Sequence, residues 1–426
     1  MIKTLQFNRA PRKIMLILAV ACVALIPGCM QSGGQRPVGT MSMEHGEQTC
    51  PFKPANSVHC GRTPTTAFDD NGRLWVSYVV DEHVYVIWSA DQGNTYSSPV
   101  RVNSVPEPVY TNGENRAKVA FGPNGEIYVS WTKVLEGPFA GDIRFSRSLD
   151  GGKSFEPVRT INDDGLITSH RFESIYVTES GNIFMAWLEK RDQVAALQAG
   201  RDYNGAAVYY TYSTDNGATF APNSKVADYS CECCRIAMSE TAYGDVAIFW
   251  RHIYDGTTRD HGFAELGTDG VVTPAQRATI DNWKIEACPH HGPTMVTASE
   301  VGYHISWFTL GDVRKGIFYG HYDPESGDII NLHPVAGAGS GHPYLARVEN
   351  KLYLVWKQFD GEKTGIRMMI SVDEGASWQA VTTVADTADA SDHPLLITHD
   401  DMVFLSWHTA TEGLRIIPLN QAGSVQ

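Results

Sequence analysis

The sequence predicts an all-β fold, a seven-bladed β-propeller, because two kinds of repeat run through it with a common rhythm. The first is an eight-residue pattern, Ser-x-Asp-x-Gly-x-Ser/Thr-aromatic, which occurs four times, starting at Ser89, Ser148, Ser213 and Ser371. The second is a strand that ends at an aromatic residue; its seven copies end at Tyr78, Trp131, Trp187, Trp250, Trp307, Trp356 and Trp407. Successive aromatics lie between 49 residues (Trp307 to Trp356) and 63 residues (Trp187 to Trp250) apart. That spacing suits a four-stranded blade with its loops.

Residues 1–28 are typical of an export signal. A basic start is followed by an apolar run over 14–27, which is too short to span a bilayer comfortably. The run ends in Gly28-Cys29, which resembles a lipobox, so we expect cleavage before Cys29 and lipidation of its thiol. The alternative is an ordinary signal peptide in which Cys29 is incidental. Met30 follows Cys29 in place of an aspartate, which mildly favours the outer membrane of a cell envelope.

The remaining chain divides into a tether over 29–58 and the propeller over 59–420. The tether lacks apolar periodicity. The last unit, from Ser391, has room for only three strands, so residues 45–58 are expected to add the fourth and close the ring. Merging the last unit with the first would give six blades, which is the alternative count. The net charge of −14 argues against nucleic acid as a partner, and the lipid is the only membrane attachment expected.

The eight-residue pattern has the chemistry of a tight β-hairpin. The aspartate accepts backbone N–H bonds inside the turn, glycine supplies a positive φ, and the aromatic anchors the returning strand. A decayed copy lies at Tyr322-Asp323-Pro324-Glu325-Ser326-Gly327. The pattern resembles the Asp box of the sialidase superfamily. Sialidases have six blades, however, so a count of seven departs from that family.

One basic residue recurs at the start of each unit's first strand, between 14 residues (His393 to Trp407) and 16 residues (Arg62 to Tyr78) before the aromatic. The seven are Arg62, Arg116, Arg171, Arg235, His291, His342 and His393. First strands line the axis of a propeller, so these side chains are expected to gather at one channel mouth. Strand-end hydrogen bonds or salt bridges would explain any one of them. The whole set favours a small anion or a metal ion as a counter-charge, with the four arginines binding the anion.

Cysteines occupy the same places along the chain. Cys50 and Cys60 could form a disulfide at the tether, and Cys288 could pair with one of Cys231, Cys233 and Cys234, as is natural in an oxidising compartment. The other interpretation is a metal site. Thiolate and imidazole donors together suit copper or zinc, and copper is favoured for the cell envelope. The candidate ligands are Cys231, Cys233, Cys234, Cys288, His290, His291, His342 and His393.

The sialidase resemblance implies a different site. Sialidases bind the substrate carboxylate with three arginines and use a tyrosine nucleophile assisted by glutamate, with an aspartate as acid/base. Arg62, followed by Pro64, is similar to the first arginine motif, and Arg235 could be the second. Glu173 and Tyr344 are candidates for the channel, but no third arginine or acid/base follows from spacing.

Three functions are therefore carried forward. The first is metal binding, with redox catalysis conceivable. The second is an exo-acting glycoside hydrolase for an acidic sugar. The third is a scaffold without catalysis.

Overall fold

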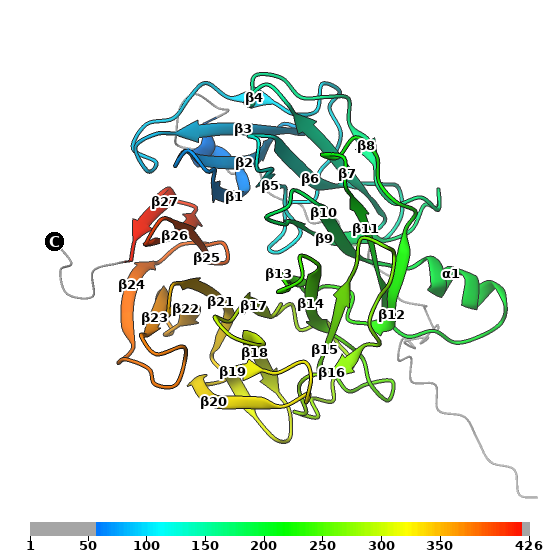
Figure 1. Cartoon of the computed structure of the whole chain (residues 1–426), viewed down its shortest axis with the longest axis vertical. Coiled ribbons are helices and arrows are strands. Elements are labelled where there is room, and N and C mark those ends of the chain that lie inside the picture. The colour runs from blue at the N-terminus through cyan, green and yellow to red at the C-terminus, as the bar shows by residue number, and fades with distance from the viewer. Residues whose placement is uncertain (1–56, 420–426) are drawn as a thin grey trace, which may run out of the picture. The chain divides into compact units, whose positions relative to one another are not determined.

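The strands form seven small antiparallel sheets arranged as a ring (Figure 1). The computed structural model describes residues 57–419, and each sheet is a meander in which strands pair in chain order. The seven-bladed architecture predicted from the sequence is confirmed, and the six-bladed alternative is wrong. The signal peptide, Cys29 and almost all of the tether lie outside the described residues.

The first four blades have four strands each. Blade 1 contains β1 (Arg62–Phe68), β2 (Leu74–Val80), β3 (His83–Ser89) and β4 (Val100–Arg101). Blade 2 contains β5 (Lys118–Phe121), β6 (Ile127–Val134), β7 (Gly141–Ser148) and β8 (Arg159–Thr160). Blade 3 contains β9 (His170–Val177), β10 (Ile183–Glu189), β11 (Ala206–Ser213) and β12 (Ser224–Ser230). Blade 4 contains β13 (Ala237–Glu240), β14 (Val246–Arg251), β15 (His261–Leu266) and β16 (Gln276–Arg277).

Of the last three blades, blades 5 and 6 have four strands each and blade 7 has three. Blade 5 contains β17 (Thr294–Thr297), β18 (Tyr303–Leu310), β19 (Lys315–Tyr322) and β20 (Ile329–Ala336). Blade 6 contains β21 (Ser340–Val348), β22 (Lys351–Phe359), β23 (Thr364–Ser371) and β24 (Thr382–Thr387). Blade 7 contains only β25 (Leu395–His399), β26 (Met402–Thr409) and β27 (Gly413–Pro418).

The ring closes where the start of the described chain meets blade 7. The segment expected to add a strand, 45–58, lies almost wholly outside the described residues. Its continuation, Val58–Cys60, is a short 3-10 helix, η1, which contacts β27. His59 Nδ1 accepts a hydrogen bond from the Leu414 N–H at 3.2 Å, and the His59 carbonyl lies 3.2 Å from His408 Nε2. The segment that leads into blade 1 is therefore joined to blade 7 by two hydrogen bonds, each between a side chain and the backbone.

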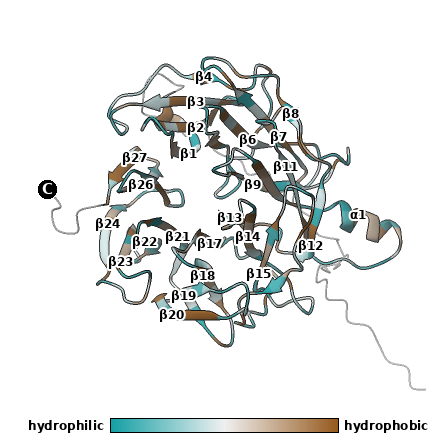
Figure 2. Ribbon diagram, viewed as in Figure 1, coloured by the Kyte–Doolittle hydropathy of each residue, from teal (hydrophilic) through white to brown (hydrophobic). Residues whose placement is uncertain are grey.

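The core consists of hydrophobic clusters between neighbouring blades. The seven predicted aromatics lie in the second strands and are fully buried. Trp75 and Trp131 share one cluster between blades 1 and 2, and Trp407 packs with Val355 between blades 6 and 7. Hydrophobic segments run along the strands, and the connecting loops are more hydrophilic (Figure 2). Each blade is thus stabilised by its two neighbours.

The four Asp-box hairpins have the same bonding in every copy. In the third, Ser213 Oγ donates to Asp215 Oδ1 at 2.7 Å and accepts from the Gly217 N–H at 2.9 Å. Asp215 accepts from the Thr219 N–H and hydroxyl at 2.9 and 2.6 Å. Although desolvation opposes them, these bonds lower the pKa of Asp215 to about 2. The box therefore closes the hairpin between the third and fourth strands.

The one α-helix in the described part of the chain, α1 (Arg191–Gln198), follows β10. Between residues 57 and 419, no helix has the length and apolar character needed to cross a membrane.

Candidate metal centre

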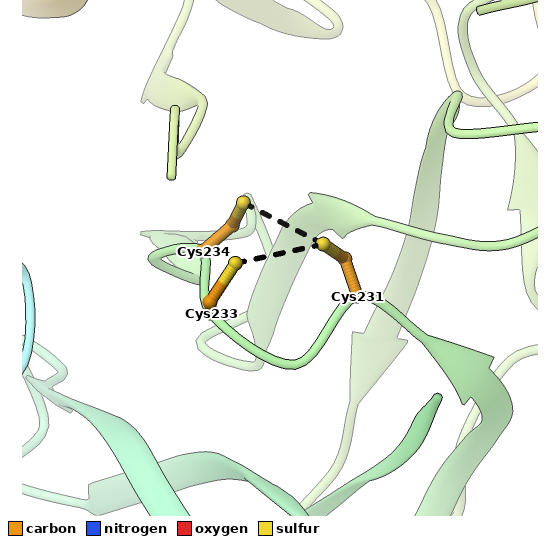
Figure 3. Close-up of side chains that lie close together, drawn as sticks. All are labelled: Cys231, Cys233 and Cys234. Carbon is orange, nitrogen blue, oxygen red and sulfur yellow. Dashed lines mark hydrogen bonds between the residues drawn. The ribbon is translucent and has the colours of Figure 1, made fainter. Parts of the chain in front are cut away.

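Three buried thiols converge in the loop that leads from β12 into β13. Cys231, Cys233 and Cys234 are 1%, 3% and 2% exposed. The Cys231 sulfur lies 3.9 Å from that of Cys233 and 3.8 Å from that of Cys234. Figure 3 shows the three side chains turned toward one another. The Cys231 N–H donates to the Arg251 carbonyl at 3.0 Å, which fixes the loop against β14. We call these three residues the thiol triad.

The spacing of the triad fits a metal ion better than a disulfide. A disulfide needs its sulfurs about 2.05 Å apart, and all three thiols are free. Sulfurs bonded at about 2.3 Å to one tetrahedral ion lie roughly 3.8 Å from each other. The three sulfurs lie within 4.8 Å of one another, so the loop holds them near the separation that a shared ion would impose.

Cys288 is a fourth free thiol, and it is exposed. Hydrogen bonds with the Cys231 and Cys233 thiols lower its pKa. The same two thiols, with the Arg251 guanidinium, hold the pKa of Cys234 well below its usual value although burial opposes them. The hydrogen bond with Cys231 raises the pKa of Cys233. The cluster thus favours the thiolate form, which binds metals, at Cys234 and Cys288, and the protonated form at Cys231 and Cys233.

Cys60 forms a disulfide. Its predicted partner, Cys50, lies outside the described residues.

The predicted histidines come from three successive blades and stack on one another. The ring centroids of His291 and His342 are 4.7 Å apart. Those of His342 and His393 are 3.5 Å apart, and the planes of these two rings meet at 20°. The Nδ1 atoms of His291 and His342 are buried without a hydrogen-bond partner. Burial lowers the pKa of His291 to about 4 and that of His342 well below its usual value. Burial thus favours the neutral form of both rings.

The donor atoms fall into two groups within the predicted site. One is the thiol triad, and the other is Glu114, His342 and His393, whose ligand atoms also lie within 4.8 Å of one another. The near-parallel rings of His342 and His393 direct their in-plane lone pairs side by side, so both cannot point at one ion without rotating. Glu114, His393, Cys233 and the exposed His290 all line one cavity of about 200 Å³. The two groups thus face a common space.

A third group of possible metal ligands, which the sequence did not suggest, is an ion-pair network. His170 Nε2 lies 3.1 Å from Asp164 and 3.9 Å from Glu189, and its Nδ1 lies 2.8 Å from the Gly141 carbonyl. Arg191 is paired with Glu189. The Arg191 guanidinium is therefore already the counter-ion of the carboxylates in this group.

The four predicted arginines have different surroundings. Arg116 donates to both oxygens of Asp392, at 2.9 and 2.6 Å. Arg235 donates to both oxygens of Glu114, at 3.0 and 3.1 Å, and its guanidinium covers the Tyr344 ring at 4.8 Å. These two guanidiniums carry internal counter-ions, so an external anion would have to compete with a carboxylate.

Arg171 and Arg62 complete the set. Arg171 is buried with its guanidinium 5.0 to 5.3 Å from the rings of Tyr110, Phe139 and Phe172. Arg62 is exposed at the start of β1.

The central cavity of about 810 Å³ is lined by first strands of the blades, with Arg116, Arg235 and Tyr344 among its residues. Glu173 instead binds Lys118 at 3.2 Å and Thr132 at 2.8 Å. Tyr344 interacts with Arg235, Glu114 and Arg116, and burial raises its pKa. A tyrosine–glutamate pair of the kind that the sialidase resemblance implies is therefore not formed by Tyr344 and Glu173.

Sequence reasoning missed Glu114, Asp392 and Arg251. Glu114 lies two residues before Arg116 and Asp392 directly precedes His393, so both were adjacent to the repeated basic position. Both acidic residues could have been found by asking which neighbouring side chain neutralises the basic residue at that position. Arg251 directly follows the strand aromatic Trp250 and carries no comparable signal.

Comparisons with known proteins support the fold only. No protein-family model matches the chain, and no curated protein matches it. Similar solved structures include an ulvan lyase, with 12% identity over 84% of this chain and 93% of the lyase, at a TM-score of 0.51. Others are a protein of unknown function from Dyadobacter fermentans (15% identity, 70% and 90% coverage, TM-score 0.46) and the NanB sialidase from Streptococcus pneumoniae (11% identity, 79% and 69% coverage, TM-score 0.46). The chain thus has a β-propeller fold distantly similar to that of an ulvan lyase.

Proposed function

We propose that this chain is an envelope-anchored β-propeller that binds one transition-metal ion, preferably copper, through the thiol triad. The observation that carries the proposal is the convergence of three buried, free sulfurs at 3.8 and 3.9 Å. Thiolate is the protein ligand that soft metal ions prefer. Lipid attachment at Cys29 and an envelope location rest on the sequence alone.

Copper is preferred to zinc because of the number of sulfurs that converge. Structural zinc sites in proteins are closed by four ligands. The group within 4.8 Å contains three thiols and leaves out Cys288. Cu(I) is a soft ion that accepts three sulfur donors. His290 is exposed and lines the same small cavity as Cys233, and the exposed Cys288 is hydrogen-bonded with two thiols of the triad, so both are suited to deliver the ion.

The direct test is metal uptake by the full-length protein. Under anaerobic, reducing conditions we expect about one equivalent of copper to remain bound after desalting, and Cys234→Ser to lose it. His342→Gln should keep the equivalent, because the triad alone holds the ion. His333→Gln, on the outer strand β20, is the histidine control and should match the wild type.

Two results would overturn the proposal. One is uptake below about a tenth of an equivalent by the wild-type protein. The other is full uptake by Cys234→Ser, which would move the ion away from the triad. Loss of copper in His342→Gln alone would assign the ion to the imidazole group instead. Circular dichroism of each variant, compared with the wild type, shows whether a loss reflects unfolding.

A further inference from the structure

Two thiols of the triad, Cys231 and Cys234, are separated by two residues along the chain. They form a Cys-x-x-Cys motif, a spacing used by proteins that exchange dithiols and disulfides. Their sulfurs lie 3.8 Å apart, and their side chains are turned toward each other (Figure 3). A disulfide needs about 2.05 Å between its sulfurs, so rotation of two side chains that already face each other closes the bond.

The loop that carries the motif is held by contacts that use no sulfur. The Cys231 N–H donates to the Arg251 carbonyl at 3.0 Å. Glu232, inside the motif, pairs with Lys190 at 2.9 Å. The backbone therefore keeps its place while the sulfurs change partners.

Solvent reaches this pair through a third thiol. Cys231 and Cys234 are only 1% and 2% exposed. Cys288 is exposed and is hydrogen-bonded with Cys231. Cys231 thus lies between the exposed thiol and the buried one and is in contact with both. This order gives an external disulfide a path to a pair that it cannot reach directly.

We propose that Cys288, Cys231 and Cys234 form a thiol–disulfide relay. The relay exchanges electrons with a small disulfide, written R–S–S–R, that reacts at Cys288. It stores the oxidised state as a buried disulfide between Cys231 and Cys234. An exported protein, as the sequence predicts here, works in a compartment where disulfides form and persist.

Each step of the relay is an exchange in which one S–S bond forms as another breaks. Cys288 attacks R–S–S–R, forms a mixed disulfide with one half and releases the other half as a thiol. Cys231 attacks the Cys288 sulfur and releases the second half as a thiol. Cys234 then attacks the Cys231 sulfur and returns Cys288 to its thiol. In sum, two protein thiols lose two electrons and two protons, which convert R–S–S–R into two thiols.

The relay also regulates the metal site, and this part rests on the proposed function. Cys231 and Cys234 are two of the three sulfurs that bind copper. The thiolate is the form that binds a metal, and a disulfide contains none. Oxidation leaves Cys233 as the one thiol of the triad, so copper is released, and reduction restores the site.

The experiment follows the thiols of the full-length, metal-free protein. The reduced protein is treated with excess glutathione disulfide, its remaining thiols are alkylated, and its tryptic peptides are analysed by mass spectrometry. The whole triad lies in the peptide 226–235, and Cys288 lies in the peptide 285–314. We expect the treatment to create an internal disulfide in the peptide 226–235.

Four variants assign the steps. Cys233→Ser should keep the internal disulfide. Cys234→Ser should stop the relay one step earlier, with the two peptides linked by a disulfide between Cys231 and Cys288. Cys288→Ser should slow the oxidation about tenfold or more, because access limits the rate of exchange. Ala287→Ser, at the exposed position next to Cys288, is the control and should match the wild type.

Three labelling results would overturn the relay. The first is a wild-type peptide 226–235 without an internal disulfide after treatment. The second is loss of that disulfide in Cys233→Ser, which would assign the bond to a different pair. The third is an oxidation rate in Cys288→Ser equal to that of the wild type, since the entry thiol would then be unnecessary.

Copper binding is measured separately on the reduced and the oxidised protein. We expect about one equivalent in the reduced form and less than roughly a tenth in the oxidised form. If the reduced protein binds no copper, the proposed function fails, and the labelling still decides the relay. If the oxidised protein binds a full equivalent, the redox control of the metal site is wrong.

Discussion

At the scale of single residues, Glu114 connects most of the channel mouth. It accepts from Arg235, lies 3.2 Å from His393 Nδ1, and lines both the small cavity and the central one. Although burial opposes it, the Arg235 guanidinium holds the pKa of Glu114 well below its usual value. One carboxylate thus neutralises an arginine and positions a histidine from blade 7.

Replacing this carboxylate should destabilise the ring strongly. Glu114→Gln leaves the partly buried Arg235 guanidinium without its counter-ion, and removing one partner of a fully buried pair typically costs about 3–5 kcal/mol, which is the upper limit here. We expect a clear fall in the free energy of unfolding, measured by chemical denaturation, while copper binding by the thiol triad persists in the folded protein. Glu362→Gln, at an exposed position between β22 and β23, should have no effect. A Glu114→Gln protein as stable as the wild type would show that Arg235 finds another anion.

At the scale of elements, the Asp-box hairpin is a local device that needs few contacts outside itself. Its serine carries the most buried part of the bonding, because Ser213 Oγ serves both the Asp215 carboxylate and the Gly217 N–H. Gly217 has a φ of +73°, and a Cβ there would lie 2.8 Å from the Phe145 ring of the neighbouring blade. The box therefore also sets the distance between blades.

Removing the serine hydroxyl tests this element. In Ser213→Ala the Gly217 N–H loses its acceptor inside the hairpin, and an unsatisfied buried donor costs about 1–3 kcal/mol. We expect a lower Tm by thermal circular dichroism. Ser104→Ala, at an exposed position after β4, should leave Tm unchanged. An equal Tm for Ser213→Ala and wild type would mean that water replaces the hydroxyl.

At the scale of the whole molecule, several buried histidines make the ring sensitive to acid. Burial lowers the pKa of His252 and His304 to about 4, and it also lowers that of His408 at the ring closure. A histidine with a depressed folded pKa contributes full stability above its unfolded value of about 6.5 and loses it as the pH falls toward its folded value. The depressed carboxylate of Glu114 acts in the same direction at lower pH.

Stability should therefore decline steadily between about pH 6.5 and pH 4. His252→Phe removes one titrating group and keeps a ring against Trp250 and Tyr254. Because Nδ1 of His252 has no hydrogen-bond partner, the variant should fold and show a flatter dependence of Tm on pH. The measurement is Tm across this range for both proteins. A dependence as steep as that of the wild type would exclude His252 as a contributor.

The sequence by itself determined the repeating architecture. The box, with four copies, and the strand aromatic, with seven, are both local patterns, because each hairpin depends mainly on residues near it in the chain. Seven strand aromatics at a steady spacing indicate seven blades. The sequence also predicted that first strands line the axis, and first strands do line the central cavity. Only the tertiary structure decided the partners of the basic residues. Arg116 meets Asp392 across 276 positions, and Arg235 meets Glu114 across 121. Such pairings depend on how the ring closes, and no local periodicity encodes the charge that a side chain finds across it.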